Sequence, residues 1–253
     1  MPFAEIARTV VTVCLVLFLL GLNETQANSQ GGPAERTMPL APGFHQLEFS
    51  IDDGDPLRCS VWVPKIREHT QAPLVVALHW GGEVTPFFGA GILRSLAVPA
   101  FEDLAAIIVA PDCPGRGWTD PTSERHVLSL LKFAVGTWPV DTQRIAITGF
   151  SMGGQGCWFF ASRHPDLFSA VVPVAGMPMG IKNVRAPVYA INARQDEIVE
   201  LAPTRRAIDE LRARGVPVEL VVLNGPTHYE TGKFVTPLKK AAEWLRRIWE
   251  PAS

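Results

Sequence analysis

Short apolar runs alternate with longer amphipathic stretches along most of the chain. Continuous apolar runs are typical of parallel strands buried on both faces, and they occur at residues 74–78, 106–110, 144–148, 170–174, 188–191 and 218–223. Apolar positions at helical spacing lie between and after them, at residues 92–104, 123–135, 152–163, 203–214 and 233–249. This order predicts an α/β fold with a mostly parallel central sheet and helices on both faces.

Two further strands are predicted ahead of this pattern. Residues 44–51 and 57–63 favour strands, and Asp52-Asp53-Gly54-Asp55-Pro56 is typical of a turn between them, so we expect an antiparallel hairpin. For the helix at 123–135, Thr122 or Ser123 is the expected N-cap.

The first 27 residues are predicted to lie outside this domain. An apolar run at residues 9–22 follows Arg8 and precedes a polar stretch that ends in Thr25-Gln26-Ala27. This layout is typical of a secretory signal peptide, cleaved before Asn28, and it predicts export. The alternatives are an uncleaved anchor, although a span needs about 20 apolar residues, and a buried core helix. Residues 28–42 are expected to form a flexible leader, and residues 43–253 a single domain.

Composition narrows the possible partners. A net charge of −2 gives no indication of nucleic acid or of an anionic membrane surface, so no membrane association is expected after signal cleavage. The histidines and cysteines lack metal-ligand spacing, and neither a metal nor a cofactor is expected. Signal removal leaves Cys59, Cys113 and Cys157, whose pairing the sequence does not determine. The oligomeric state is also left open.

Candidate chemistry is concentrated at Gly149-Phe150-Ser151-Met152-Gly153, between a predicted strand and a predicted helix. A serine on such a sharp turn projects its hydroxyl from the edge of the sheet, where a base can reach it. The flanking glycines suit a strained turn where strand and helix nearly touch. Ser151 is therefore the candidate nucleophile.

A serine nucleophile needs a base, and in this kind of fold the base follows the acid along the chain. Downstream of Ser151 the histidines are His164 and His228. His164 lies at the end of the predicted helix 152–163 and fits a capping role. His228 lies in a loop after the last predicted strand, at the edge where open α/β sheets place their active sites, so it is the candidate base.

The acid is sought between Ser151 and His228. Asp166 follows a proline at a helix end, and Asp209 lies within a predicted helix as a solvated charge. Asp196 follows the strand at 188–191 and is the candidate acid, with Glu197 and Glu200 as alternatives.

An oxyanion needs fixed backbone donors. One is expected at the amide of Met152, directly after the nucleophile, and the other in the loop His79-Trp80-Gly81-Gly82. The alternative interpretation of this loop is a plain tight turn. His79 is interpreted as a structural hydrogen-bonding residue.

Together these segments resemble the α/β-hydrolase superfamily. The chain is most similar to its carboxylesterase, dienelactone hydrolase and polyhydroxybutyrate-depolymerase-like esterases, from about residue 44 onward. The resemblance implies roughly eight strands, a Ser-Asp-His triad, ester hydrolysis through an acyl-enzyme, and an oxyanion amide at Gly81. The connection 175–187 is too short for the lid domain often inserted there.

One position departs from the family pattern, because Trp80 stands where glycine usually follows the loop histidine. A positive φ there would strain Trp80; alternatively, its side chain forms a wall of the substrate pocket. Trp118 is a second pocket candidate, with loop packing as the alternative.

The leading hypothesis is an exported serine hydrolase that cleaves small-molecule or polymeric carboxylic esters. A serine peptidase of the prolyl-oligopeptidase-like branch and a non-catalytic binding protein are the alternatives.

Overall fold

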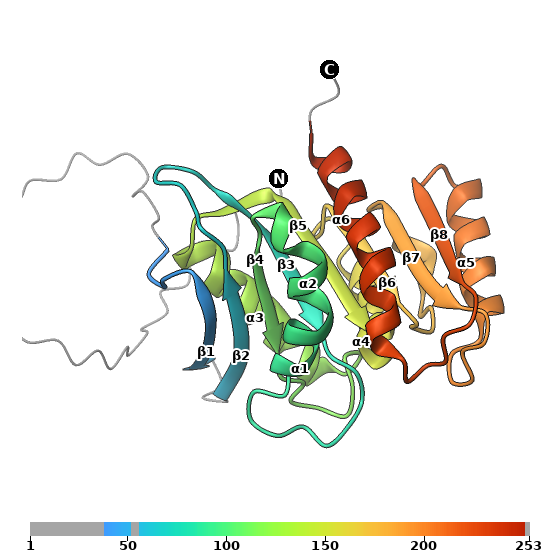
Figure 1. The fold of residues 1–253 in the computed structure, drawn as a ribbon, viewed down its shortest axis with the longest axis horizontal. Coiled ribbons are helices and arrows are strands. Elements are labelled where there is room, and N and C mark those ends of the chain that lie inside the picture. The colour runs from blue at the N-terminus through green and yellow to red at the C-terminus, as the bar shows by residue number, and fades with distance from the viewer. Residues whose placement is uncertain (1–37, 52–55, 251–253) are drawn as a thin grey trace, which may run out of the picture.

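A computed structural model describes residues 38–51 and 56–250 of the chain. Eight strands form one sheet in the order β1-β2-β4-β3-β5-β6-β7-β8 (Figure 1). The first three strands in that order pair antiparallel, and every later neighbouring pair is parallel. The predicted α/β-hydrolase architecture with an N-terminal hairpin and a mostly parallel sheet is confirmed.

The strands follow the predicted apolar runs. Their bounds are β1 Gly43–Ser50, β2 Pro56–Val63, β3 Ala72–Leu78, β4 Ile107–Pro111, β5 Val140–Phe150, β6 Ala170–Val174, β7 Val188–Ala193 and β8 Val218–Leu223. β5 is the longest and begins four residues before the predicted start at Arg144. The three polar residues among them, Asp141 to Gln143, are partly exposed or exposed and do not continue the buried apolar run.

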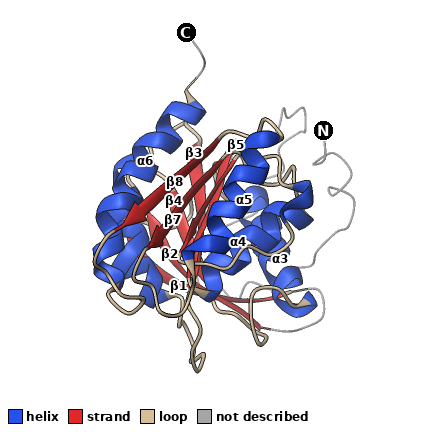
Figure 2. Cartoon of the chain, turned by 90° about the vertical axis from the view of Figure 1, so that its right-hand side faces the viewer, coloured by secondary structure: helices blue, strands red, loops and turns tan. Residues whose placement is uncertain are grey.

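Helices cover both faces of the sheet (Figure 2). Their bounds are α1 Ala90–Ile92, α2 Val98–Phe101, α3 Pro121–Thr137, α4 Met152–Arg163, α5 Leu201–Ala213 and α6 Val235–Trp249. A π-helical segment, Leu93–Ala97, joins α1 to α2, so the predicted helix at 92–104 is a composite of helical types. α3, α4 and α5 pack on one face of the sheet, whereas α1, α2 and α6 pack on the other.

β3 shows why these buried strands read as continuous apolar runs. Leu74 and Val76 point to the face that α3 and α4 cover, whereas Val75 and Ala77 point to the face that α2 and α6 cover. Successive side chains of a strand alternate between faces, and here both faces are buried.

One local prediction is corrected. The N-cap of α3 is Asp120, whose carboxylate accepts a hydrogen bond from the Ser123 N–H at 2.9 Å, rather than Thr122 or Ser123. Pro121 occupies the first turn, where no N–H is needed, so the helix begins two residues earlier than the predicted Ser123. The connection 175–187 contains one short 3₁₀ helix, Ile181–Asn183, and no lid domain.

The packed region begins before the predicted start at residue 43, because Met38 and Leu40 contact the core cluster beneath α3 and α4. The predicted signal peptide, most of the predicted leader and the hairpin turn at 52–55 lie outside the described residues. Across the described part of the chain, every helix is too short or too polar to cross a membrane.

Cys59, Cys113 and Cys157 are all buried and unpaired. Burial, with a smaller contribution from the charge of Asp112, raises the pKa of the Cys59 thiol to about 12. Burial also raises the pKa of the other two thiols. All three therefore behave as small core side chains, as predicted for Cys157.

Candidate active site

Ser151 lies on the turn between β5 and α4 with φ 56° and ψ −115°. A positive φ is rare for a residue with a side chain and costs about 1–3 kcal/mol. The backbone at both sides holds this conformation. The Ser151 N–H donates to the Val174 carbonyl at 2.9 Å, and the Ser151 carbonyl accepts from the Gln155 N–H at 2.9 Å.

The flanking glycines are required by close backbone contact. A Cβ at Gly153 would overlap the carbonyl of Leu78 at the end of β3, and a Cβ at Gly149 would lie 2.5 Å from the Gly153 backbone. Strand and helix therefore approach more closely here than any side chain allows, as expected for a turn that presents a nucleophile.

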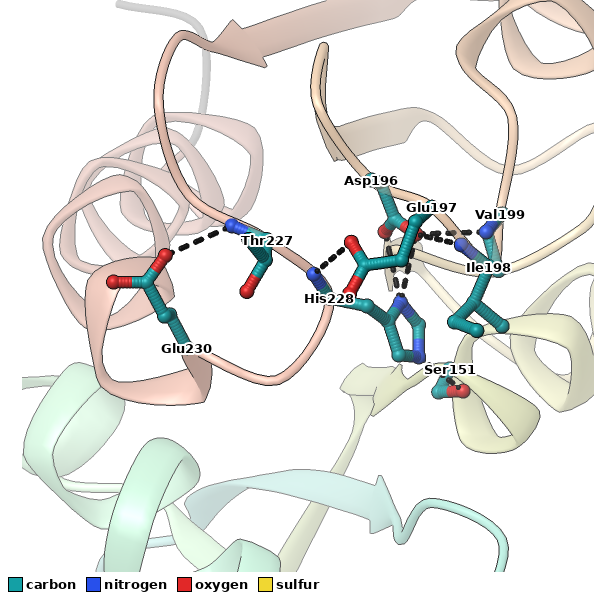
Figure 3. Close-up of polar contacts among 8 residues, drawn as sticks. All are labelled: Ser151, Asp196, Glu197, Ile198, Val199, Thr227, His228 and Glu230. Atoms are coloured by element: carbon teal, nitrogen blue, oxygen red, sulfur yellow. Dashed lines mark hydrogen bonds and ion pairs between the residues drawn. The ribbon is translucent and has the colours of Figure 1, made fainter.

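The structure brings Ser151, Asp196 and His228 together (Figure 3). His228 Nε2 lies 2.8 Å from Ser151 Oγ, and His228 Nδ1 lies 2.8 and 3.0 Å from the two carboxylate oxygens of Asp196. The three residues follow β5, β7 and β8, at the carboxyl ends of parallel strands. This is the nucleophile–base–acid geometry of serine hydrolases.

Backbone donors hold the acid. Asp196 Oδ1 accepts hydrogen bonds from the N–H groups of Ile198 at 2.9 Å and Val199 at 2.7 Å (Figure 3). These donors stabilise the ionised carboxylate and fix its orientation, with Oδ2 directed at the imidazole. Because Asp196 accepts from His228 Nδ1–H, Nε2 is free to accept the hydroxyl proton of Ser151.

Glu197 has a supporting role that the sequence did not disclose. Asp196, not Glu197, contacts the His228 ring, and the carboxylate of Glu197 instead accepts a hydrogen bond from the backbone N–H of His228 at 3.1 Å. It therefore ties the loop of the base to the loop of the acid. Its place directly after Asp196 is the one sequence signal for this role.

The candidate base and acid are buried, whereas the candidate nucleophile is partly exposed. His228 is 5% exposed and Asp196 9%, whereas Ser151 is partly open to solvent. The ring of Phe150 packs beneath the imidazole of His228 with centroids 5.1 Å apart. Base and acid are thus shielded from water while the hydroxyl remains accessible to a ligand.

His79 lies in the loop after β3 and is fully buried. Its Nδ1–H donates to the Trp80 carbonyl at 2.6 Å, and its Nε2 accepts from the Cys113 N–H at 3.0 Å. A carbonyl can only accept and a backbone N–H only donate, so these partners define the neutral tautomer. Burial lowers the pKa of His79 below its ordinary 6.5, which also favours the neutral ring. The structural interpretation of His79 is supported.

Asp112, directly after β4, was not identified from the sequence. Its carboxylate accepts the N–H groups of Phe87 at 2.6 Å and Gly89 at 2.9 Å, which lie on the segment that continues the His79 loop. Burial raises the pKa of Asp112, and these two hydrogen bonds oppose the rise. Asp112 therefore anchors the loop to the end of a neighbouring strand.

Trp118 does not line the cleft. Its side chain is fully buried, and its Nε1–H donates to the His79 carbonyl at 2.8 Å. The apolar body of the indole fills the core beside Gly156, where an added Cβ would be 2.6 Å from Trp118 Cβ. The pocket interpretation is wrong, and the packing alternative holds, because the loop 112–120 folds inward after β4.

Trp80 is partly exposed and has no positive φ, so the departure from the family pattern introduces no strain of that kind. Its indole meets the Phe150 ring edge-on at 6.3 Å and contacts the α1 backbone at Gly91. Gly81 lies beside Met152, with its Cβ position 3.8 Å from Met152 Sδ. The loop and the residue after the nucleophile therefore adjoin.

His164, Asp166 and Asp209 contact other polar side chains apart from the triad. His164 Nε2 lies 2.7 Å from Glu124 Oε1 on α3. Asp166 pairs with Arg185 at 3.2 Å, and Asp209 pairs with Arg212 at 2.9 Å, all of them largely exposed. Within residues 38–51 and 56–250, no group of three His, Cys, Asp or Glu side chains is arranged to hold a metal ion.

The fold and the site geometry agree with comparisons to known proteins. The chain has the α/β-hydrolase fold, and part of its sequence is similar to proteins named as esterases and cutinases. Residues 117–241 match the Dienelactone hydrolase family. The matched segment contains all three triad residues, whereas Trp80 and Gly81 lie outside it.

Among curated proteins, Protein usf of Aquifex pyrophilus is 33% identical over 47% of this chain and 55% of its own length. Cutinase 2 of Thermobifida cellulosilytica is 31% identical over 43% of this chain and 42% of its own length. The chain thus spans about half the length of the curated relatives that it matches.

Solved structures share the fold at low identity. A thermostable esterase superposes with a TM-score of 0.70 at 22% identity, covering 81% of this chain and 62% of that one. The acylaminoacyl peptidase of Pyrococcus horikoshii superposes with a TM-score of 0.65 at 18% identity, covering 83% of this chain and 43% of that one. Both esterases and peptidases therefore use this scaffold.

Proposed function

We propose that this protein is an exported serine hydrolase that cleaves carboxylic esters through an acyl-enzyme. The observation that carries the proposal is the continuous hydrogen-bonded line from Ser151 Oγ through His228 to Asp196, with contacts of 2.8 Å on both sides of the imidazole. A match to the dienelactone hydrolase family across the triad, and relatives named as cutinases, support the choice of ester substrates.

In the first half-reaction, Ser151 Oγ attacks the ester carbonyl carbon while His228 Nε2 takes the hydroxyl proton. Asp196 stabilises the imidazolium that forms. The carbonyl oxygen becomes an oxyanion, for which the Met152 and Gly81 N–H groups are the proposed donors. The tetrahedral intermediate collapses with cleavage of the C–O bond, and His228 gives its proton to the departing alcohol.

In the second half-reaction, water attacks the acyl carbon and gives a proton to His228 Nε2. Collapse of the second tetrahedral intermediate returns that proton to Ser151 Oγ and releases the carboxylic acid. The same imidazole thus serves first as base and then as acid in each half. The two half-reactions balance with only the ester, water and the three side chains.

The rim of the site suggests apolar ester groups. Ile198 and Tyr229 adjoin the acid and the base, and they are 53% and 73% exposed. The Tyr229 ring meets the His228 ring edge-on at 5.8 Å, and Figure 3 shows the Ile198 side chain above Ser151. Large apolar side chains exposed beside a nucleophile are well placed to contact an acyl chain or an apolar polymer.

Active-site labelling with a fluorophosphonate, followed by assays on matched ester and amide substrates, tests the proposal. We expect a stoichiometric adduct on Ser151 and faster turnover of the ester. A folded protein with no adduct would favour the non-catalytic binding protein. An adduct with preference for the amide would favour the peptidase, whose fold is shared by the acylaminoacyl peptidase.

Export is the least direct part of the proposal and rests on the apolar run at residues 9–22. Mass spectrometry of the protein expressed from the full reading frame tests it. A mature N-terminus at Asn28 in the exported fraction is expected, and a full-length chain held in the membrane would favour the uncleaved anchor instead.

A further inference from the structure

A second hollow lies outside the triad, between the β1–β2 hairpin and the start of the α1–π-helix segment. Its volume is about 190 Å³, and it is lined among others by Phe44, Gln46, Ser60, Leu93 and Arg94. Ser60 and Leu93 are buried and form its floor, whereas the other three are exposed and form its rim. We call it the outer hollow. In the sheet order, β2 stands three strands from β5, roughly 14 Å sideways from the strand of Ser151.

The floor carries one polar group that has no hydrogen-bond partner among the described residues. The Ser60 Oγ and, two residues along the same strand face, the Trp62 Nε1 are buried, and neither has a hydrogen-bond partner in the part of the chain that the structure describes. Ser60 is 2% exposed. A buried polar group left unsatisfied destabilises a fold by about 1–3 kcal/mol. Such a hydroxyl at the floor of an open hollow is suited to bind a ligand atom.

The rim carries a positive charge, the guanidinium of Arg94. The Arg94 guanidinium lies 4.4 Å from the centre of the Phe44 ring, and among the described residues it forms no ion pair. Stacking on a ring occupies the face of a guanidinium and leaves its N–H edge free to bind an anion. Glu48, on the same strand as Phe44, is paired with Arg58 at 2.6 Å.

Aromatic surface completes the lining. Phe44 is 40% exposed, and its ring packs on Trp62 with centroids 4.8 Å apart. Leu93 and Arg94 begin the π-helical segment Leu93–Ala97. Short π-helical segments are uncommon and occur frequently at functional sites.

We propose that the outer hollow binds a carboxylate attached to an apolar ring or chain. One cation matches a singly charged carboxylate better than a doubly charged phosphate ester. One carboxylate oxygen would pair with Arg94 and the other with the Ser60 hydroxyl or the Gln46 amide, while the apolar part lies along Phe44. This binding site is separate from the triad and does not depend on the proposed hydrolytic function.

An NMR titration of the full chain with benzoate tests the proposal. We expect saturable shifts of the Arg94 side-chain Nε–H and the Gln46 side-chain amide, with Kd below about 10 mM. Neutral benzamide should leave these signals unshifted. Benzoate that enters the triad instead would move the His228 ring signals, so the two sites report separately even in a chain without hydrolytic activity.

Three variants sharpen the titration. Arg94→Met should weaken benzoate binding at least about tenfold, because a charge-assisted hydrogen bond is lost. The matched control Arg205→Met, at an exposed position on α5, should leave Kd unchanged. Ser60→Ala should weaken binding about threefold or more and should not lower Tm, since it removes an unsatisfied hydroxyl.

Equal affinity in the Arg94→Met and Arg205→Met proteins overturns the proposal. So do shifts confined to His228, or equal binding of benzamide. A Ser60→Ala protein that binds benzoate normally would restrict the carboxylate to the rim and contradict the role assigned to the hydroxyl.

Discussion

The two sides of the candidate active site are held in place by different means. On one side, Ser151, Asp196 and His228 contact one another directly, and the groups that fix their geometry are the groups that would react. On the other side, the Trp80–Gly81 loop and the segment that continues it are held by hydrogen bonds to residues outside the triad, above all His79 and Asp112. The comparison teaches that a triad can be recognised by its own chemistry, whereas an oxyanion loop depends on its buried supports.

Replacing the nucleophile should give the largest effect on the triad side. Ser151→Ala removes the attacking oxygen and should lower kcat for a soluble ester by about 10⁶-fold, as in other serine hydrolases. Ser162→Ala, on the same helix α4, is the matched control and should retain activity. Steady-state kinetics measure both, and near-native turnover of the Ser151 variant would remove it from the mechanism.

Replacing the acid should come next. Asp196→Asn keeps the shape but cannot stabilise an imidazolium and favours the wrong tautomer of His228, so kcat should fall by about 10⁴-fold. Asp166→Asn, an exposed aspartate in a surface ion pair, should have no measurable effect. Equal activity of the two variants would assign the acid elsewhere, with Glu197 as the first alternative.

A substitution on the loop side should lower kcat less than those in the triad, and it should also lower Tm. In Asp112→Asn, the amide oxygen can accept a hydrogen bond from one of the Phe87 and Gly89 N–H groups. The amide NH₂ group would then face the other N–H, and two donors cannot pair. We expect a fall of about 5 °C in Tm and about tenfold in kcat, with KM nearly unchanged. Asp103→Asn, at an exposed position, is the control. A lowered Tm with unchanged kcat would show that the segment does not position the donors.

The smallest predicted effect is a pH dependence of stability on the loop side. Burial places the pKa of His79 in the folded protein below the 6.5 of the free side chain. Between those two values the unfolded chain binds one more proton, so stability falls as pH drops below about 6.5. Thermal denaturation from pH 7.5 to 5 measures this fall.

The variant His79→Gln should flatten that profile by a few degrees, because glutamine can donate and accept without titrating. A profile identical in the His79 variant and the original protein would contradict a buried neutral ring.

The same contrast explains what the sequence could predict. Helix α4 and strand β6 were predicted correctly, and the three residues predicted as a triad lie within hydrogen-bonding distance of one another. Buried strands, glycine-flanked turns and the chain order of such residues leave strong local patterns. The supports were missed because they act over long sequence distances. Asp112 binds the Phe87 N–H across 25 positions, and Trp118 Nε1 binds the His79 carbonyl across 39. A tryptophan near a strand end gives no local sign of whether it turns outward or into the core.

The three buried thiols provide a measure of how this molecule opens. Thiol reagents attack the thiolate, and in the folded protein both the access and the thiolate are suppressed. Cys59 lies on β2, Cys113 follows β4 and Cys157 lies on α4, so each samples a different element. Labelling rates in native buffer would therefore report the free energy of opening the edge hairpin, the loop support and the nucleophile helix separately. Equal rates would mean that the molecule opens as a single cooperative unit.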